Sequence, residues 1–255
     1  MSASDFPDPL KLISTLASTY AQCSTYKDNG IVETTIQPGT ASATSRQVWF
    51  TTYFRRPNYF RFAFLSRTVK DAPSSDSLSV IWSDGKRTYS KMPYIFWNPE
   101  SDLNSAITGT IGVTHEASHR IPALLMPHLV KQLPPNETKR IGVESIESLD
   151  EESCYRVHHE LEPDQIEREY WISQSRSLLL KVREQMVLSH NTAKAFNAEG
   201  GPSTLLSNLL MRGMEALSSS VAKNPTPIPI VNETIYRNVT LNEPIPDSAF
   251  TERGR

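Results

Sequence analysis

Apolar side chains near the start of the chain recur at steps of three and four residues. Leu10, Ile13, Leu16 and Tyr20 follow this spacing, which places them on one side of an α-helix. The pattern therefore predicts an amphipathic helix over residues 9–26.

The period changes to two beyond the pair Asn29-Gly30, which is a turn signal. Short runs rich in β-branched and aromatic residues follow, separated by Pro, Gly, Ser and Asp. These runs predict strands at 31–36, 47–55, 59–67, 78–82 and 87–91. The pair Asp84-Gly85 predicts a tight hairpin between the last two. We expect the region 31–92 to form consecutive antiparallel strands.

Residues 94–133 interrupt the strand pattern with several Pro and Gly residues. This region predicts two short helices that form a lid. Strand signals return after Pro134-Pro135, joined by short polar turns. Within 137–190 they predict strands at 139–146, 153–161, 167–173 and 178–188. An additional amphipathic helix is predicted at 203–223, and a last strand at 233–241 within a final segment, 232–250.

The order of these elements predicts an α+β fold in one domain that spans residues 1–255. A long antiparallel meander has helices on one side or at one end. A sheet of this size must curl, and its concave face has to be filled by side chains, helices or a ligand.

Composition narrows the classes of function. The 255 residues include 26 Lys and Arg against 28 Asp and Glu, for a net charge of -2, and 38% of the side chains are apolar. This supports a substantial core and excludes the basic surface of a nucleic-acid binder. No apolar run approaches the roughly 18 residues that a membrane-spanning helix needs. Met1–Asp8 lacks the features of a secretory signal, so either the protein is cytosolic or a signal was removed.

Two cysteines leave two interpretations open. Cys23 and Cys154 could form one disulfide that closes a loop of about 130 residues. They could equally be two buried free thiols.

The segment His115-Glu-Ala-Ser-His119 matches the H-E-x-x-H pattern of zinc peptidases. In that pattern two His one helical turn apart share a metal ion, and Glu116 would be the general base. The mechanism needs a continuous helix, but Gly112 precedes the motif and Pro122 follows it closely. Zinc hydrolysis is therefore the less favoured hypothesis.

His158 and His159 are adjacent in a predicted strand and point to opposite faces, so they cannot chelate one ion together. The chain has no G-x-S-x-G, no phosphate-binding glycine loop and no C-x-x-C. We expect no metal, no cofactor and no enzymatic activity.

Aromatic residues give a stronger signal. In the run Tyr59–Leu65, period two places Phe60, Phe62 and Phe64 on one face of the strand. These rings and their neighbours form either an ordinary core under the helices or the wall of an apolar cavity. The candidate cavity residues are Phe50, Tyr53, Phe54, Phe60, Phe62, Phe64, Trp82 and Tyr89.

Three segments together carry a family resemblance: Tyr53–Phe62 with its Arg-Pro pair, Ser83–Lys86, and Asn242–Phe250. The first helix leads into a Tyr-x-x-Cys-x-x-Tyr-x-Asp-x-Gly pattern, made by Tyr20, Cys23, Tyr26, Asp28 and Gly30. In these motifs the chain resembles the LolA/LolB-like family of periplasmic lipoprotein carriers, in particular a longer bacterial branch, from about residue 10 to 250.

The resemblance implies a strongly curved antiparallel sheet that forms an unclosed β-barrel capped by helices. It implies that Arg56 holds the lid closed through hydrogen bonds to backbone, that Phe60 lies near the cavity mouth, and that Phe62 lies deeper. It also favours a Cys23–Cys154 disulfide and hence an oxidising, periplasmic or otherwise exported location. The predicted helix at 203–223 departs from the compact carriers, so the lid and the ligand can differ.

We therefore expect a monomeric, non-enzymatic carrier that binds the acyl chains of a lipid or an acylated lipoprotein, with a membrane-bound complex as donor or acceptor and no nucleic-acid partner. The alternative is an envelope module that senses a lipid or protein signal without transport.

Overall fold

The computed structural model describes residues 6–41, 43–68, 78–92, 95–100, 102–130, 137–162, 166–188 and 227–252. Its helices are α1 (Pro9–Gln22), α2 (Leu103–Thr108), α3 (Ile111–Thr114), α4 (Ala117–Leu125) and the 3₁₀ helix η3 (Asp247–Phe250). Its strands are β1 (Thr25–Ile36), β2 (Thr44–Arg55), β3 (Tyr59–Thr68), β4 (Ser79–Asp84), β5 (Thr88–Met92), β6 (Ile95–Glu100), β7 (Glu137–Leu149), β8 (Glu152–Glu162), β9 (Ile166–Ser173), β10 (Leu179–Leu188) and β11 (Ile228–Leu241).

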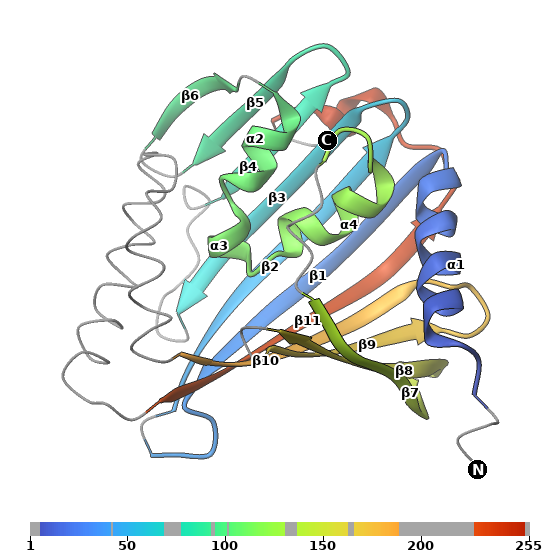
Figure 1. Cartoon of the computed structure of the whole chain (residues 1–255). Helices are drawn as coiled ribbons and strands as arrows, with labels where there is room; N and C mark the ends of the chain where they lie inside the picture. Colours follow the sequence, from blue (N-terminus) through green and yellow to red (C-terminus); the bar gives the residue numbers. More distant parts are fainter. Residues whose placement is uncertain are drawn as a thin grey trace.

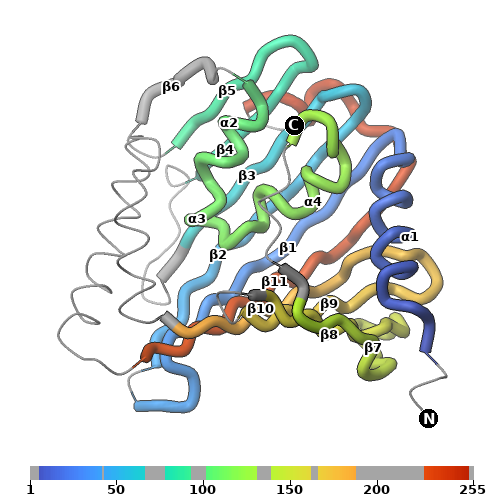
Figure 2. The backbone as a smooth tube through the Cα atoms, in the orientation of Figure 1, coloured from blue at the N-terminus to red at the C-terminus, as the bar shows by residue number. Residues whose placement is uncertain are grey.

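The strands form one antiparallel sheet in the order β6-β5-β4-β3-β2-β1-β11-β10-β9-β8-β7. The order runs from β6 to β7 without pairing these two strands, so the sheet is curved but not closed. Figure 1 shows it bending so that β7–β10 lie across the lower ends of the other strands, with α1 and α2–α4 on the inner face. The backbone trace in Figure 2 follows the same bend. The predicted fold class is confirmed.

Two boundaries near the start differ from prediction. The first helix ends at Gln22 rather than at residue 26, because Cys23 has an extended backbone and β1 begins at Thr25. The predicted turn at Asn29-Gly30 is wrong, since β1 continues through it with a register shift between Lys27 and Asn29. A bulge of this kind bends the strand without ending it.

The region predicted as two helices contains β6 and three helices, α2 to α4. The last strand begins at Ile228, five residues earlier than the predicted start at 233. The helix predicted at 203–223 lies outside the described residues. Among the described helices, none combines the length and the apolar character needed to cross a bilayer.

Alternation along the strands separates an inner face, against the helices, from an outer face. On β1 every second position from Tyr26 to Thr34 is buried, at Tyr26, Asp28, Gly30, Val32 and Thr34. Tyr26 and Val32 belong to the main hydrophobic core, which also contains residues of α1 and α4.

The C-terminal segment covers part of the outer face. Arg61 of β3 donates from Nε to the carbonyl oxygen of Thr251, at 3.1 Å. Phe250 of η3 packs against Tyr59, with ring centroids 5.6 Å apart. This contact closes the outer side of β3 and β4.

Gly30 is a point of close approach on the inner face, and we predict that Gly30→Ala destabilises the fold. An alanine Cβ would lie 2.2 Å from Cζ of Phe50 and 2.5 Å from the backbone oxygen of Ile235. The expected loss in free energy of unfolding is about 1–3 kcal/mol. Urea denaturation measures it. Gly142→Ala is the matched control, since its Cβ would meet nothing within 4 Å; equal effects of the two substitutions would contradict this account of Gly30.

Candidate functional site

Arg56 connects two helices with the end of β2. Its Nε donates to the carbonyl oxygen of Cys23 at 2.7 Å, and its Nη2 donates to Leu125 O of α4 at 3.0 Å. The same nitrogen also donates to the carbonyl oxygens of Tyr20 and Ala21, in the last turn of α1. The guanidinium group therefore binds carbonyl groups at the C-terminal ends of α1 and α4. This is the kind of contact with backbone that the resemblance implied for Arg56.

Five of the predicted cavity residues are phenylalanines on the inner face. Phe54, Phe60 and Phe62 are fully buried, and Phe50 and Phe64 are 3% exposed. The rings of Phe50 and Phe62 stack with centroids 5.6 Å apart. These residues belong to the main core together with residues of α2 and α4.

The other three predicted cavity residues lie on the outer face, which corrects the prediction. Trp82 stacks on Tyr89 in a small separate cluster, with ring centroids 5.1 Å apart. Tyr53 packs against the cluster that contains Phe250. Strict alternation is the reason, because Ile81 and Phe54 take the inward positions next to Trp82 and Tyr53.

Both cysteines are buried free thiols, so the predicted Cys23–Cys154 disulfide is not formed. Each Sγ donates to a carbonyl oxygen nearby in the chain: Cys23 to Tyr20 at 3.1 Å, and Cys154 to Glu152 at 3.5 Å. Burial raises the pKa of Cys154 to about 11. Burial also raises the pKa of Cys23. Both groups are therefore weak nucleophiles at neutral pH.

The H-E-x-x-H segment does not form the helix that zinc peptidases need. His115 ends α3 and Glu116 precedes α4, and both have left-handed backbones, with φ of 47° and 66°. The two His residues therefore do not lie one turn apart on one helix. Glu116 is held by arginines instead, which corrects its assignment as a general base.

A cavity of about 280 Å³ lies between α1, α4 and strands β8–β10. Its lining has an apolar part and a charged part. The lining residues are Ile13, Leu16, Glu116, His119, Arg120, Ala123, Leu124, His159, Arg168, Tyr170, Ile172 and Leu179.

Four charged side chains form a network at one end of this cavity. Glu116 accepts from Nη2 of Arg120 at 2.9 Å and from Nη2 of Arg168 at 3.0 Å. On the sheet, Arg168 Nε donates to Glu184 at 2.5 Å. Glu184 also lies 3.9 Å from Arg120. Burial disfavours the charge on Glu116, but Arg120 and Arg168 outweigh burial and hold its pKa below the usual value.

The strand register explains why this network lies where it does. Thr34, Asn232, Glu184, Arg168 and His159 are register partners across five neighbouring strands on the inner face. They form a polar row that crosses the sheet. The sequence contains a signal for this row, since Glu184 and Arg168 lie two residues from the inward-facing Val182 and Tyr170 and therefore share their face. The predicted site residues were instead taken from the aromatic runs.

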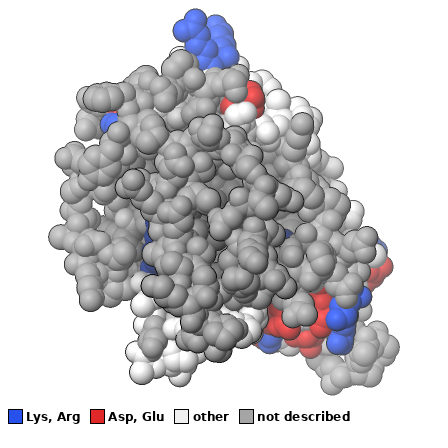
Figure 3. Space-filling view, turned by 60° about the vertical axis from the view of Figure 1, so that its left-hand side comes forward, with Lys and Arg blue, Asp and Glu red and all other residues white. Residues whose placement is uncertain are grey.

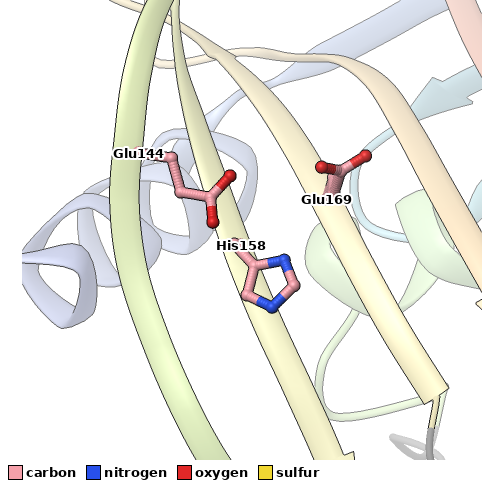
Figure 4. Close-up of side chains that lie close together, drawn as sticks. All are labelled: Glu144, His158 and Glu169. Carbon is pink, nitrogen blue, oxygen red and sulfur yellow. The ribbon is translucent and has the colours of Figure 1, made fainter.

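A second charged cluster lies on the outer face. Figure 4 shows Glu144, His158 and Glu169 on adjacent strands, and one ligand atom from each lies within 4.8 Å of the others. Arg156 binds both Glu144 and Glu169, and Arg183 also pairs with Glu169 at 3.1 Å. Because arginines already compensate these carboxylates, we assign no metal to this cluster. On the face drawn in Figure 3, described acidic and basic side chains likewise lie next to one another.

Asp28 is a buried carboxyl group near the tyrosines of the core. It accepts from the hydroxyl of Tyr26 at 2.6 Å and from the backbone N–H of Thr52 at 3.0 Å. Burial raises its pKa to about 6, and these hydrogen bonds only partly oppose the shift. Asp28 therefore titrates in the mildly acidic range.

Comparisons with known proteins show a likeness to solved structures. No family profile matches the chain, and no curated protein matches it. Solved structures that resemble it include a DUF1329 family protein from Desulfovibrio piger (9% identity, 97% of this chain and 99% of the other, TM-score 0.36). Others are a putative outer membrane lipoprotein-sorting protein domain from Vibrio parahaemolyticus (7%, 99% and 98%, TM-score 0.35) and a LolA superfamily protein from Nitrosomonas europaea (13%, 97% and 99%, TM-score 0.33).

The solved structures that the chain resembles thus include one member of the superfamily that the sequence motifs suggested.

We predict that Asp28→Asn changes the pH dependence of stability. Since the folded pKa of about 6 lies above the unfolded value, Asp28 contributes stability that is fully present below about pH 4 and is lost as the pH rises through 6. Asparagine does not titrate, so the variant should gain on the parent by about 2 kcal/mol between pH 4 and pH 7. Chemical denaturation across this range measures the difference. Parallel pH profiles for the two proteins would refute the assignment.

Proposed function

We propose that the protein is a non-enzymatic carrier that binds an acyl chain of a lipid or lipoprotein between its sheet and its helices. The observation that carries the proposal is the contact of Arg56 with α1 and α4, the two helices that border the cavity. One side chain thereby contacts the ends of both helices. A membrane-bound donor or acceptor and an exported location belong to the same proposal.

The lining of the cavity supports an aliphatic ligand. Ile13 and Leu16 of α1 face Ile172 and Leu179 of the sheet across it. Each buried methylene contributes about 0.8 kcal/mol, so a chain of about 14 to 16 carbons would supply on the order of 10 kcal/mol before ordering costs. Binding of this strength needs no covalent step.

The size of the cavity implies movement. At about 280 Å³ it lies just below the range of roughly 300–1,000 Å³ for small-molecule sites. A complete acyl chain therefore requires α1 and α4 to separate from the sheet. Loading and release then depend on a lid with two positions that differ by a few kcal/mol.

We predict that Arg56→Leu keeps the fold but speeds the release of a bound acyl chain. The substitution removes the charged hydrogen bond to Leu125 O, and such bonds contribute about 1.5–3 kcal/mol. The release rate of a fluorescent fatty acid should rise on the order of tenfold to a hundredfold. Stopped-flow transfer to acceptor vesicles measures the rate.

Arg55→Leu is the matched control, because the neighbouring Arg55 donates to Ile245 O and to Asp247 of the C-terminal segment, on the outer face, rather than to α1 or α4. Equal release rates for parent and Arg56→Leu would remove the latch from the proposal. Co-purification of a membrane protein without any bound acyl species would favour the sensing module instead.

A further inference from the structure

Building on the proposed carrier function, we propose that the charged end of the cavity binds the oxyanion head group of a single-chain amphiphile. In the structure described here, the carboxylate of Glu116 occupies that place. The ligand class is thus an alkyl chain that ends in a carboxylate or a phosphate.

The two ends of the cavity differ in chemistry. Its apolar end lies between Leu16 of α1 and Leu179 of β10, while its charged end lies between Glu116, Arg120 and Arg168. An acyl chain alone matches only the first end. A ligand that matches both ends has a chain and a charged head.

Two arginine nitrogens converge on the carboxylate of Glu116. Nη2 of Arg168 donates to Oε1 at 3.0 Å, and Nη2 of Arg120 donates to Oε2 at 2.9 Å. Guanidinium groups suit carboxylate and phosphate oxygens because their planar N–H donors match this geometry. The oxyanion of a ligand can therefore replace Glu116 by presenting two oxygens to the same nitrogens.

The remaining contacts of the network permit this exchange. On the sheet, Glu184 remains hydrogen-bonded to the Nε atom of Arg168. The side chain of Glu116 is 21% exposed, against 8% for Glu184. Of the two carboxylates, Glu116 is thus the one that can turn toward solvent when an anion arrives.

The backbone also indicates that the position of Glu116 costs conformational energy. His115 and Glu116 are consecutive residues with positive φ. Conformations of this kind are unfavourable for residues other than glycine and persist where the surroundings impose them. Here they interrupt the helical region between α3 and α4 and bring a carboxylate onto Arg168.

The test measures binding of decyl phosphate, decanoate and decyl glucoside, below their micelle concentrations, by isothermal titration calorimetry. The three probes share one chain length and differ in the head group.

With Arg168→Gln, the affinity for both anionic probes should fall tenfold or more. With Glu116→Gln, it should rise on the order of tenfold, because the competing charge is removed while the side-chain shape is kept. The affinity for decyl glucoside should stay within twofold in both variants. The anionic probe that binds more tightly to the parent identifies the source of the oxyanion.

Matched controls come from the outer face, where Arg156→Gln and Glu169→Gln make the same charge changes in a comparable ion-pair cluster. Shifts of all three probes together in Glu116→Gln would mean that the residue only holds the lid, and would overturn the inference. Unchanged affinities in both variants would also overturn it while leaving the carrier in place. Failure of the parent to bind any of the three probes would instead overturn the proposed function.

Discussion

The inner face of the sheet carries large apolar side chains that the sheet itself cannot cover, because its strand order ends at β6 and β7 without joining them. Helices from two separate parts of the chain, α1 and α2–α4, have to supply the cover. Burial of the aromatic residues holds these helices in place, but burial is non-directional. The positions of the helices are therefore determined by directional hydrogen bonds at the helix ends.

Those end contacts follow the electrostatics of a helix. Neither α1 nor α4 has a basic residue in its last turn, and the guanidinium of Arg56 supplies a cation to the C-terminal carbonyl groups of both. At the other end of α4, Glu116 is the N-cap residue, but its carboxylate pairs with Arg120 and Arg168 and makes no capping hydrogen bond. Cations favour helix C-termini, so Arg56 complements the dipoles of α1 and α4. The contacts of Arg56 and of Glu116 are both polar and directional, so each can be replaced by another polar contact.

The secondary structure and the fold class could be predicted from the sequence. The side-chain positions that depend on strand register could not. The strands, the curled antiparallel sheet and the role of Phe60, Phe62 and Phe64 as an inward row follow from alternation. The outward placement of Trp82 depends on which face the helices cover, and period two alone does not say this. The bulge near Asn29 overrode a turn signal because β1 pairs on both sides along its length. The charged network could not be predicted, because Glu184, Arg168 and Glu116 meet only through strand pairing and the left-handed turn before α4.

The charged network has a property that bears on opening of the lid. Glu116 and Arg120 both belong to the α4 region, and Arg168 and Glu184 both belong to the sheet. If α4 leaves the sheet, two ion pairs remain, each neutral, and only the contacts between Glu116 and Arg168 and between Arg120 and Glu184 are lost. Breaking a buried ion pair by removing one partner costs about 3–5 kcal/mol, since it leaves an uncompensated charge. A network that divides into two neutral pairs avoids most of that cost. Opening separates Arg120 from Arg168, so the two arginines converge on a single anion only when α4 lies against the sheet.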